Sequence, residues 1–136
     1  MAVPSLHPKG KGALMKEQHD WDKVMDWEKR LDQGEGLVLT PDVADLLRRV
    51  ARDVAIPEDE AQRALFTPAA ATMLIREMCR RIREGSRRLM RAISEANRCK
   101  ETGDTAGARK ILEGVLIVEI VPLYRQHAEA ELSYLE

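Results

Sequence analysis

The residues with the greatest capacity for chemistry are arginines, concentrated in the segment RRIREGSRRLMR at positions 80–91, which holds six arginines and one glutamate. On a helix, which turns 100° per residue, arginines spaced three and four apart fall on one face. A guanidinium presents fixed donors that pair well with carboxylates and phosphates. We therefore predict a partner-binding site on this face. We define the arginine row as Arg76, Arg80, Arg83, Arg87 and Arg91.

Three interpretations of the arginine row stay open: a helix face covered by water or by the protein's own acids, a docking surface for an acidic protein, and a nucleic-acid surface. Residues 73–100 contain nine Arg or Lys and three Glu, a local charge of +6, so the remainder of a chain with net charge −1 carries −7. No aromatic residues are interleaved for stacking on bases and no zinc-finger pattern occurs, which disfavours nucleic acid. We expect an unidentified protein partner, and a homodimer stays open.

Other chemistry finds little support in the sequence. The three histidines are too scattered for metal-ligand spacing, and we expect His127 to be a surface or boundary residue and not a ligand. Cys79 and Cys99 fall within one helical pattern, about 30 Å apart and beyond disulfide reach, so both should be reduced. No glycine-rich phosphate loop occurs. We predict no catalytic residue, no metal, no cofactor and no enzymatic activity.

Composition and periodicity predict an all-α fold of about five helices. Leu, Ala, Arg, Glu and Met are abundant and aromatic residues make up 4% of the chain, which favours helix over sheet. The two longest patterns should form an antiparallel hairpin, about 68–101 and 104–135, covered by shorter N-terminal helices. Pro122 cannot donate a backbone hydrogen bond, so the second arm should bend near Val118 or break just before the proline. Candidate capping residues are Asp20, Thr40, Thr67 and either Asp104 or Thr105.

The longest predicted helix carries a heptad pattern on the side opposite the arginine row. Its apolar and small residues alternate four and three apart, as in helices that pack along a seam. Gly85 occupies one seam position where a large apolar residue is expected, which indicates close approach of a facing helix. The seam residues are Ala71, Ile75, Met78, Ile82, Gly85, Leu89, Ala92, Ala96 and Cys99.

The N-terminal segment MAVPSLHPKGKGAL carries two Pro, two Gly and two Lys without an apolar period. We predict a disordered tail over residues 1–18 and a single helical domain over 19–136. Met15 directly precedes the helical pattern and is a candidate for the true start, which the intact mass of the native protein would decide. No apolar run approaches the ~20 residues of a membrane span and no signal peptide is apparent, so we expect a cytoplasmic protein without membrane contact.

Two resemblances follow from longer strings. The segment ANRCKETGDTAGARKILEGVL is similar to the turn and second helix of a tetratricopeptide repeat, but it occurs once, which indicates a helical hairpin instead of a solenoid. Over almost all of residues 20–135, the strings DWDKV, LVLTPDVADLL, RRIREGSRRL, GDTAGARKIL and VEIVPLYRQHAE resemble the DUSAM domain, a bacterial paralogous family. The function of that family is unknown, so the resemblance implies neither a mechanism nor a functional residue.

The sequence therefore predicts a non-enzymatic interaction or regulatory module that presents the arginine row, or a groove beside it, to another protein. Two other classes stay open. One is nucleic-acid binding through the same face, which a strong salt dependence would reveal. The other is a small immunity or antitoxin-like protein, for which a neighbouring toxin gene would be the clue.

Overall fold

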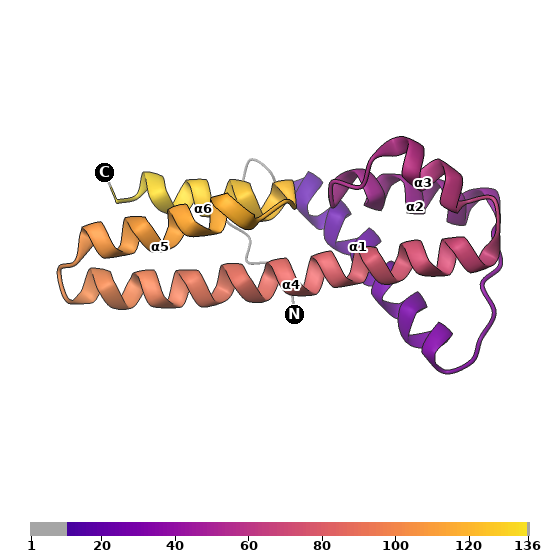
Figure 1. The fold of residues 1–136 in the computed structure, drawn as a ribbon, viewed down its shortest axis with the longest axis horizontal. Coiled ribbons are helices and arrows are strands. Elements are labelled where there is room, and N and C mark those ends of the chain that lie inside the picture. The colour runs from indigo at the N-terminus through magenta and orange to yellow at the C-terminus, as the bar shows by residue number, and fades with distance from the viewer. Residues whose placement is uncertain (1–10, 136) are drawn as a thin grey trace. The chain divides into compact units, whose positions relative to one another are not determined.

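The computed structural model describes the backbone of residues 11–135 and the side chains of residues 19–135, and this part of the chain is all-α, with six helices and no strand (Figure 1). The prediction of an all-α fold is confirmed. One helix more than expected is present, because the pattern predicted over 104–135 forms two helices. The helices are α1 (Lys11–Asp32), α2 (Pro41–Asp53), α3 (Glu58–Ala64), α4 (Pro68–Glu101), α5 (Thr105–Val118) and α6 (Pro122–Ser133).

Three of the predicted helix starts are confirmed by their capping hydrogen bonds. Thr40 Oγ1 accepts from the Val43 amide at 3.2 Å, and Thr67 Oγ1 accepts from the Ala70 amide at 3.1 Å. The carboxylate of Asp104 accepts from the backbone amide three residues on, at 2.8 Å. Each cap satisfies one of the first-turn amides that have no partner within the helix.

The predicted start at Asp20 is wrong. The first helix begins at Lys11, inside the segment predicted as a tail, because Ala, Leu, Met, Lys, Glu and Gln at 11–18 continue a helix readily. Asp20 is buried within α1, and its carboxylate accepts hydrogen bonds from Arg49 of α2 at 3.0 and 3.3 Å. Residues 1–10, the remainder of the predicted tail, lie outside the described residues.

The predicted break before Pro122 is confirmed. Helix α5 ends at Val118, and Glu119 is extended, with φ −75° and ψ 133°, before α6 begins at the proline. The guanidinium of Arg125 donates to the carbonyls of Leu116 and Glu119 at 2.7 and 2.8 Å, which gives the last turn of α5 the partners it lacks. The interruption redirects the chain without leaving these carbonyls unsatisfied.

The chain forms two compact units that divide inside α4, the first ending at Arg81 and the second beginning at Ile82. We call them the N-terminal unit and the C-terminal unit. The single helical domain predicted over 19–136 stays a prediction. None of the helices in the described part of the chain is both long and apolar enough to cross a membrane.

The N-terminal unit packs α1, α2 and α3 with the first part of α4. Trp21 Nε1 of α1 donates to Asp53 Oδ2 of α2 at 3.3 Å, and Cys79 Sγ of α4 lies 3.7 Å from the carbonyl oxygen of Val24 in α1. The apolar side chains between them are almost fully removed from water. This core contains Val24, Leu46, Leu47, Val50, Val54, Ala61, Ala71, Ile75 and Met78.

The C-terminal unit packs α5 against α6 and both against the remainder of α4 (Figure 1). Ala96 of α4 forms a buried cluster with Ala108 and Leu112 of α5, and Leu132 and Leu135 pack against it. The predicted seam is buried at every position except Cys99, which is half-buried, so this prediction is confirmed along the whole of α4.

The expectation of a surface or boundary position for His127 is wrong. Its side chain is only 3% exposed, in the same row of α6 as the buried residues Tyr124 and Ala128. These three residues are spaced three and one apart, so they share the inner face of the helix. A short helix with a weakly apolar pattern did not reveal which face turns inward.

Candidate partner-binding groove

The arginine row of α4 is divided between the two units, with Arg76 and Arg80 in the N-terminal unit and Arg83, Arg87 and Arg91 in the C-terminal unit. The distinction that matters for function is which guanidinium groups the fold itself neutralises.

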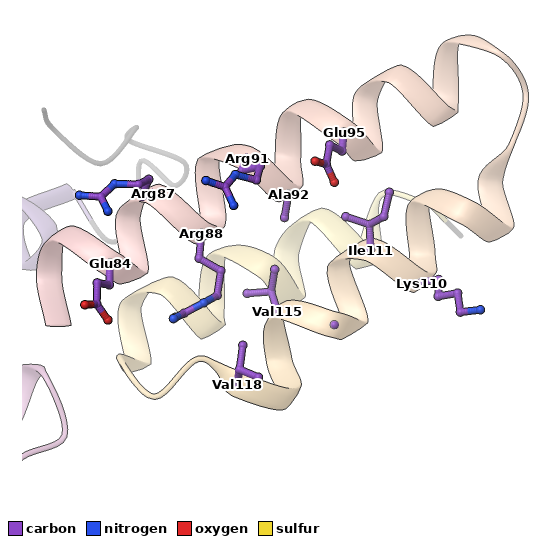
Figure 2. Close-up of a pocket in the computed structure, with 11 residues that line it drawn as sticks. Glu84, Arg87, Arg88, Arg91, Ala92, Glu95, Lys110, Ile111, Val115 and Val118 are labelled. Atoms are coloured by element: carbon purple, nitrogen blue, oxygen red, sulfur yellow. The ribbon is translucent and has the colours of Figure 1, made fainter.

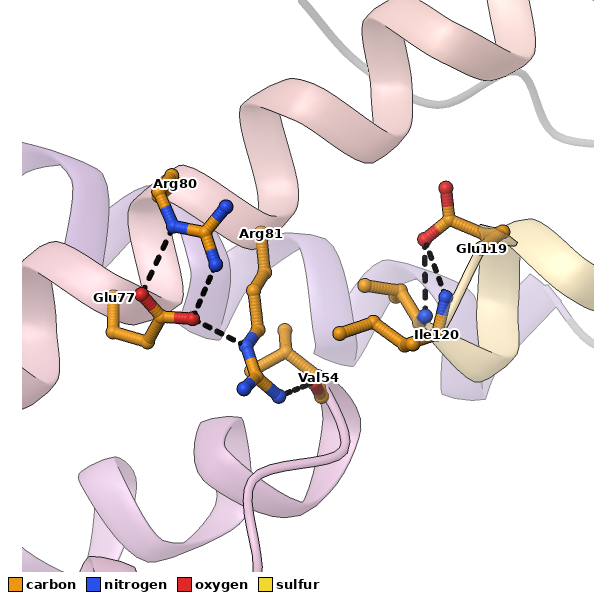
Figure 3. Close-up of polar contacts among 7 residues, drawn as sticks. Val54, Glu77, Arg80, Arg81, Glu119 and Ile120 are labelled. Carbon is orange, nitrogen blue, oxygen red and sulfur yellow. Dashed lines mark hydrogen bonds and ion pairs between the residues drawn. The ribbon is translucent and has the colours of Figure 1, made fainter. Parts of the chain in front are cut away.

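In the N-terminal unit the arginines have acidic partners from the same unit. Arg76 lies 2.7 Å from Asp32 at the end of α1. Glu77 bridges two guanidinium groups, those of Arg80 at 2.6 Å and Arg81 at 2.7 Å, and Arg81 also donates to the carbonyl of Val54 at 3.0 Å (Figure 3). The guanidinium groups of these arginines are therefore already neutralised by carboxylates of the same unit.

The electrostatics of Glu77 follow from this bridge. Hydrogen bonds from Arg80, partly opposed by desolvation and reinforced by Arg81, lower the pKa of the Glu77 carboxyl from its usual 4.5 to about 2. The group is therefore ionised over the whole physiological range. Its contribution to stability is present above pH 4.5 and is lost as the pH falls toward 2. Glu77 and Arg81 are four residues apart on α4, the spacing at which opposite charges can pair along one helix.

In the C-terminal unit Arg88 pairs with a buried carboxylate. Its guanidinium donates to Glu119 Oε1 at 2.7 Å, and the Glu119 side chain is only 1% exposed. The other carboxylate oxygen, Oε2, accepts from the amides of Ile120 and Val121 at 3.2 and 3.0 Å (Figure 3). The carboxylate therefore holds the linker between α5 and α6 and neutralises Arg88 at the same point.

Gly85 explains why the linker sits so close to α4. A Cβ built on Gly85 would lie 2.5 Å from Cδ2 and 2.7 Å from Cε2 of Tyr124, and 2.9 Å from Glu119 Oε2. The Tyr124 hydroxyl donates to the carbonyl of Ile82 at 3.0 Å, and burial raises its pKa, so it stays a protonated donor. The close approach predicted at Gly85 is confirmed, and the contact is made by the aromatic ring of Tyr124 on α6.

Arg87 and Arg91 differ from these residues. Both side chains are exposed, and among residues 19–135 neither makes a hydrogen bond or an ion pair. They lie four apart on α4, where like charges disfavour an isolated helix by a few tenths of a kcal/mol. The fold therefore carries two guanidinium groups that its own acids do not neutralise.

These two arginines border an open groove between α4 and α5, with a volume of about 650 Å³ (Figure 2). Its apolar lining consists of Ala92 on α4 and of Ile111, Val115 and Val118 on α5. Ala92 and Val115 are buried, so Ile111 and Val118 supply the accessible part. Val118 is 56% exposed, although most valines in this protein are buried. The remaining lining residues are Glu84, Arg88, Glu95, Lys110 and Gly114.

A second groove, of about 540 Å³, lies in the N-terminal unit and provides a comparison. It also combines apolar and cationic residues, with Met73 72% exposed beside Arg76 and Arg80. Its arginines, however, are paired with Asp32 and Glu77. An acidic partner would have to displace these carboxylates, which makes this groove the weaker candidate.

The sequence predicted Arg87 and Arg91 as site residues but missed the other half of the groove. Val115 and Val118 belong to an apolar run over 115–121, whose middle is expected to be buried on most sides, and Ile111 lies one turn before that run. Glu119 was also missed as the partner of Arg88. The sequence did contain a clue to this role. Glu119 is the single carboxylate within the apolar string VLIVEIVP, and a charge buried among apolar residues requires a partner.

Among the described residues, no group of three or more His, Cys, Asp or Glu side chains is arranged to hold a metal ion. Comparison with curated proteins finds no match, and comparison with solved structures finds none. The profile of one protein family matches residues 19–135. The chain belongs to the family described as "Protein of unknown function (DUF2379)".

Proposed function

We propose that this protein is a non-enzymatic interaction or regulatory module, and that it binds another protein in the groove between α4 and α5. The observation that carries the proposal is the position of Arg87 and Arg91. They are exposed cations without an ion pair in the described chain, and they border an apolar surface.

The contrast within α4 supports this assignment. Arg76, Arg80 and Arg88 each have a carboxylate within 2.7 Å, so the chain contains enough acid to neutralise arginines that serve the fold. Arg87 and Arg91 receive none, and their mutual repulsion has no structural benefit in the free protein. Arginine beside apolar surface is typical of protein interfaces.

The alternative function is nucleic-acid binding through Arg83, Arg87 and Arg91. Phosphates would satisfy the guanidinium groups, but a phosphate backbone has no apolar face to cover Ile111, Val115 and Val118. Binding to random duplex DNA should therefore be weak and vanish near physiological ionic strength, because few phosphates are neutralised. Tight binding at that ionic strength would replace the protein-binding proposal.

The proposal is tested by affinity capture from the native host with three forms of the full chain. The groove variant is Arg87→Gln/Arg91→Gln. The matched control is Arg98→Gln/Lys100→Gln, which makes the same charge change on the same helix at exposed residues that do not line the groove. We expect a protein captured by the wild type and the control but weakened between about twofold and thirtyfold by the groove variant, most strongly at low salt.

Stability separates loss of binding from loss of folding. Exposed charges contribute about 0–1 kcal/mol each, so the groove variant should unfold at nearly the wild-type urea concentration, or slightly above it once the repulsion is removed. If the groove variant unfolds more readily than the control by several kcal/mol, the arginines are structural. Equal capture by the groove variant and the control would also contradict the proposal.

Three finer expectations stay predictions beside this one. The DUSAM name rests on the resemblance of sequence strings. The cytoplasmic location rests on composition and two free cysteines. The long hairpin of 68–101 with 104–135, covered by the N-terminal helices, is proposed as the scaffold that presents the groove.

A further inference from the structure

We infer that the groove between α4 and α5 receives an acidic amphipathic helix from another protein. This inference rests on the proposed function and names the class of its partner. Three properties of the groove lead to it, namely its walls, its charges and the space above Gly114.

The walls favour a helical occupant. Both sides of the groove are helices, whose backbone N–H and C=O groups are already bonded within each helix. An extended peptide would bring unpaired backbone groups into an apolar groove with no sheet edge to pair with, and each such group is costly to desolvate. A helix satisfies its own backbone and needs only its side chains to bind, as in other helix-in-groove complexes.

The charges specify acidic side chains on that helix. Arg87 and Arg91 are four residues apart on α4, which is a rise of about 6 Å along the helix axis. Two carboxylates spaced four apart on a partner helix have the same separation and can face both guanidinium groups. Lys110 adds a further cation on the α5 side of the groove, whereas Glu84 and Glu95 line it on the α4 side (Figure 2). The partner's carboxylates are therefore expected at Arg87 and Arg91 only.

The apolar surface specifies the other face of the partner helix. Ile111, Val115 and Val118 are spaced four and three apart, so they form one stripe along α5. Gly114 lies beside this stripe, and a Cβ built on it would meet no atom within 4 Å. The glycine therefore leaves room for a large apolar side chain from the occupant.

A second copy of this chain is a poorer occupant. A symmetric dimer places the same patch against itself, which would bring Arg87 and Arg91 of both copies together. Like charges at a contact are strongly unfavourable. Sedimentation of the chain alone therefore should give the mass of a monomer at the concentrations used for binding.

The test uses four probes and the ¹⁵N-labelled full chain, with binding followed through backbone amide shifts. The first probe is a peptide of about 18 residues with a leucine stripe and glutamates four apart beside it. The second replaces the glutamates by glutamine. The third contains the residues of the first in scrambled order, and the fourth is random duplex DNA. We expect the first probe to shift amides of residues 84–95 and 110–118, and to bind about tenfold more tightly than the second at low salt.

Two substitutions at one position locate the probe. Gly114→Phe fills the open space and should abolish the shifts, whereas Gly114→Ala leaves the groove open and should keep them. Arg87→Gln/Arg91→Gln should bring the affinity for the first probe down to that for the second. These variants keep the test interpretable if Phe disturbs the local packing.

Each contrary result has a distinct meaning. Equal binding of the first two probes, or of the scrambled one, overturns the acidic-helix inference but keeps a protein-binding groove. Tight DNA binding, self-association through the groove, or an absence of shifts with all four probes overturns the proposed function itself. Binding of the first probe that is unaffected by Gly114→Phe places the helix elsewhere and contradicts the inference.

Discussion

Replacing Gly85 by leucine should destabilise the protein by about 1–3 kcal/mol, although glycine is a poor helix former at this position. The first added carbon already meets the ring of Tyr124 at 2.5 Å. That ring cannot move aside easily, because it is 1% exposed and its hydroxyl is bonded to the Ile82 carbonyl. The free energy of unfolding in urea measures the loss.

Two alanine substitutions separate crowding from helix propensity. Gly85→Ala and Gly114→Ala each gain about 1 kcal/mol of propensity, but only the first places its Cβ against the ring. We expect Gly114→Ala to be stabilising and Gly85→Ala to be destabilising. If Gly85→Leu unfolds at a higher urea concentration than the wild type, then Gly85 faces open space and the packing described for Tyr124 is incorrect.

The second large effect is expected at Glu119. Truncation to alanine removes the partner of Arg88 and the acceptor for the amides of Ile120 and Val121. Breaking a buried ion pair costs about 3–5 kcal/mol, but the Arg88 side chain is 37% exposed and can regain water, so we expect a loss of about 2–4 kcal/mol. Chemical unfolding of Glu119→Ala provides the measurement.

Glu119→Gln is the matched control, because it keeps the shape and one carbonyl oxygen that can accept from the linker amides. We expect it to lose about half as much as Glu119→Ala, since the charge is removed but the linker keeps an acceptor. An alanine variant as stable as the wild type would show that the linker needs no carboxylate. The break between α5 and α6 would then depend on Pro122 alone.

Local signals in the sequence were sufficient for most of the helix boundaries. Thr40, Thr67 and Asp104 are short polar side chains placed before a helical pattern, and the start of each helix depends only on nearby residues. Pro122 acts in the same local way, because its missing N–H ends a helix regardless of the fold. The seam of α4 is long enough that its period identifies the buried face.

Features that depend on a distant residue could not be predicted. Asp20 is of a residue type that often caps helices. In the structure its carboxylate instead accepts a hydrogen bond from Arg49, which lies far away in the sequence. The same holds for Arg88, whose partner Glu119 is brought near by the packing of α5 and α6. The arginine row alone therefore could not show which guanidinium groups the fold neutralises, and that difference defines the groove.

Hydrogen exchange of backbone amides tests the central claim most directly. The full chain is compared alone and with the protein it captures, at an ionic strength low enough to keep the complex. Binding to the groove should slow exchange in residues 84–95 of α4 and 110–118 of α5, and leave residues 60–81 at their free rate. Slowed exchange confined to residues 60–81, or none within 84–95, would contradict a binding site built on Arg87 and Arg91.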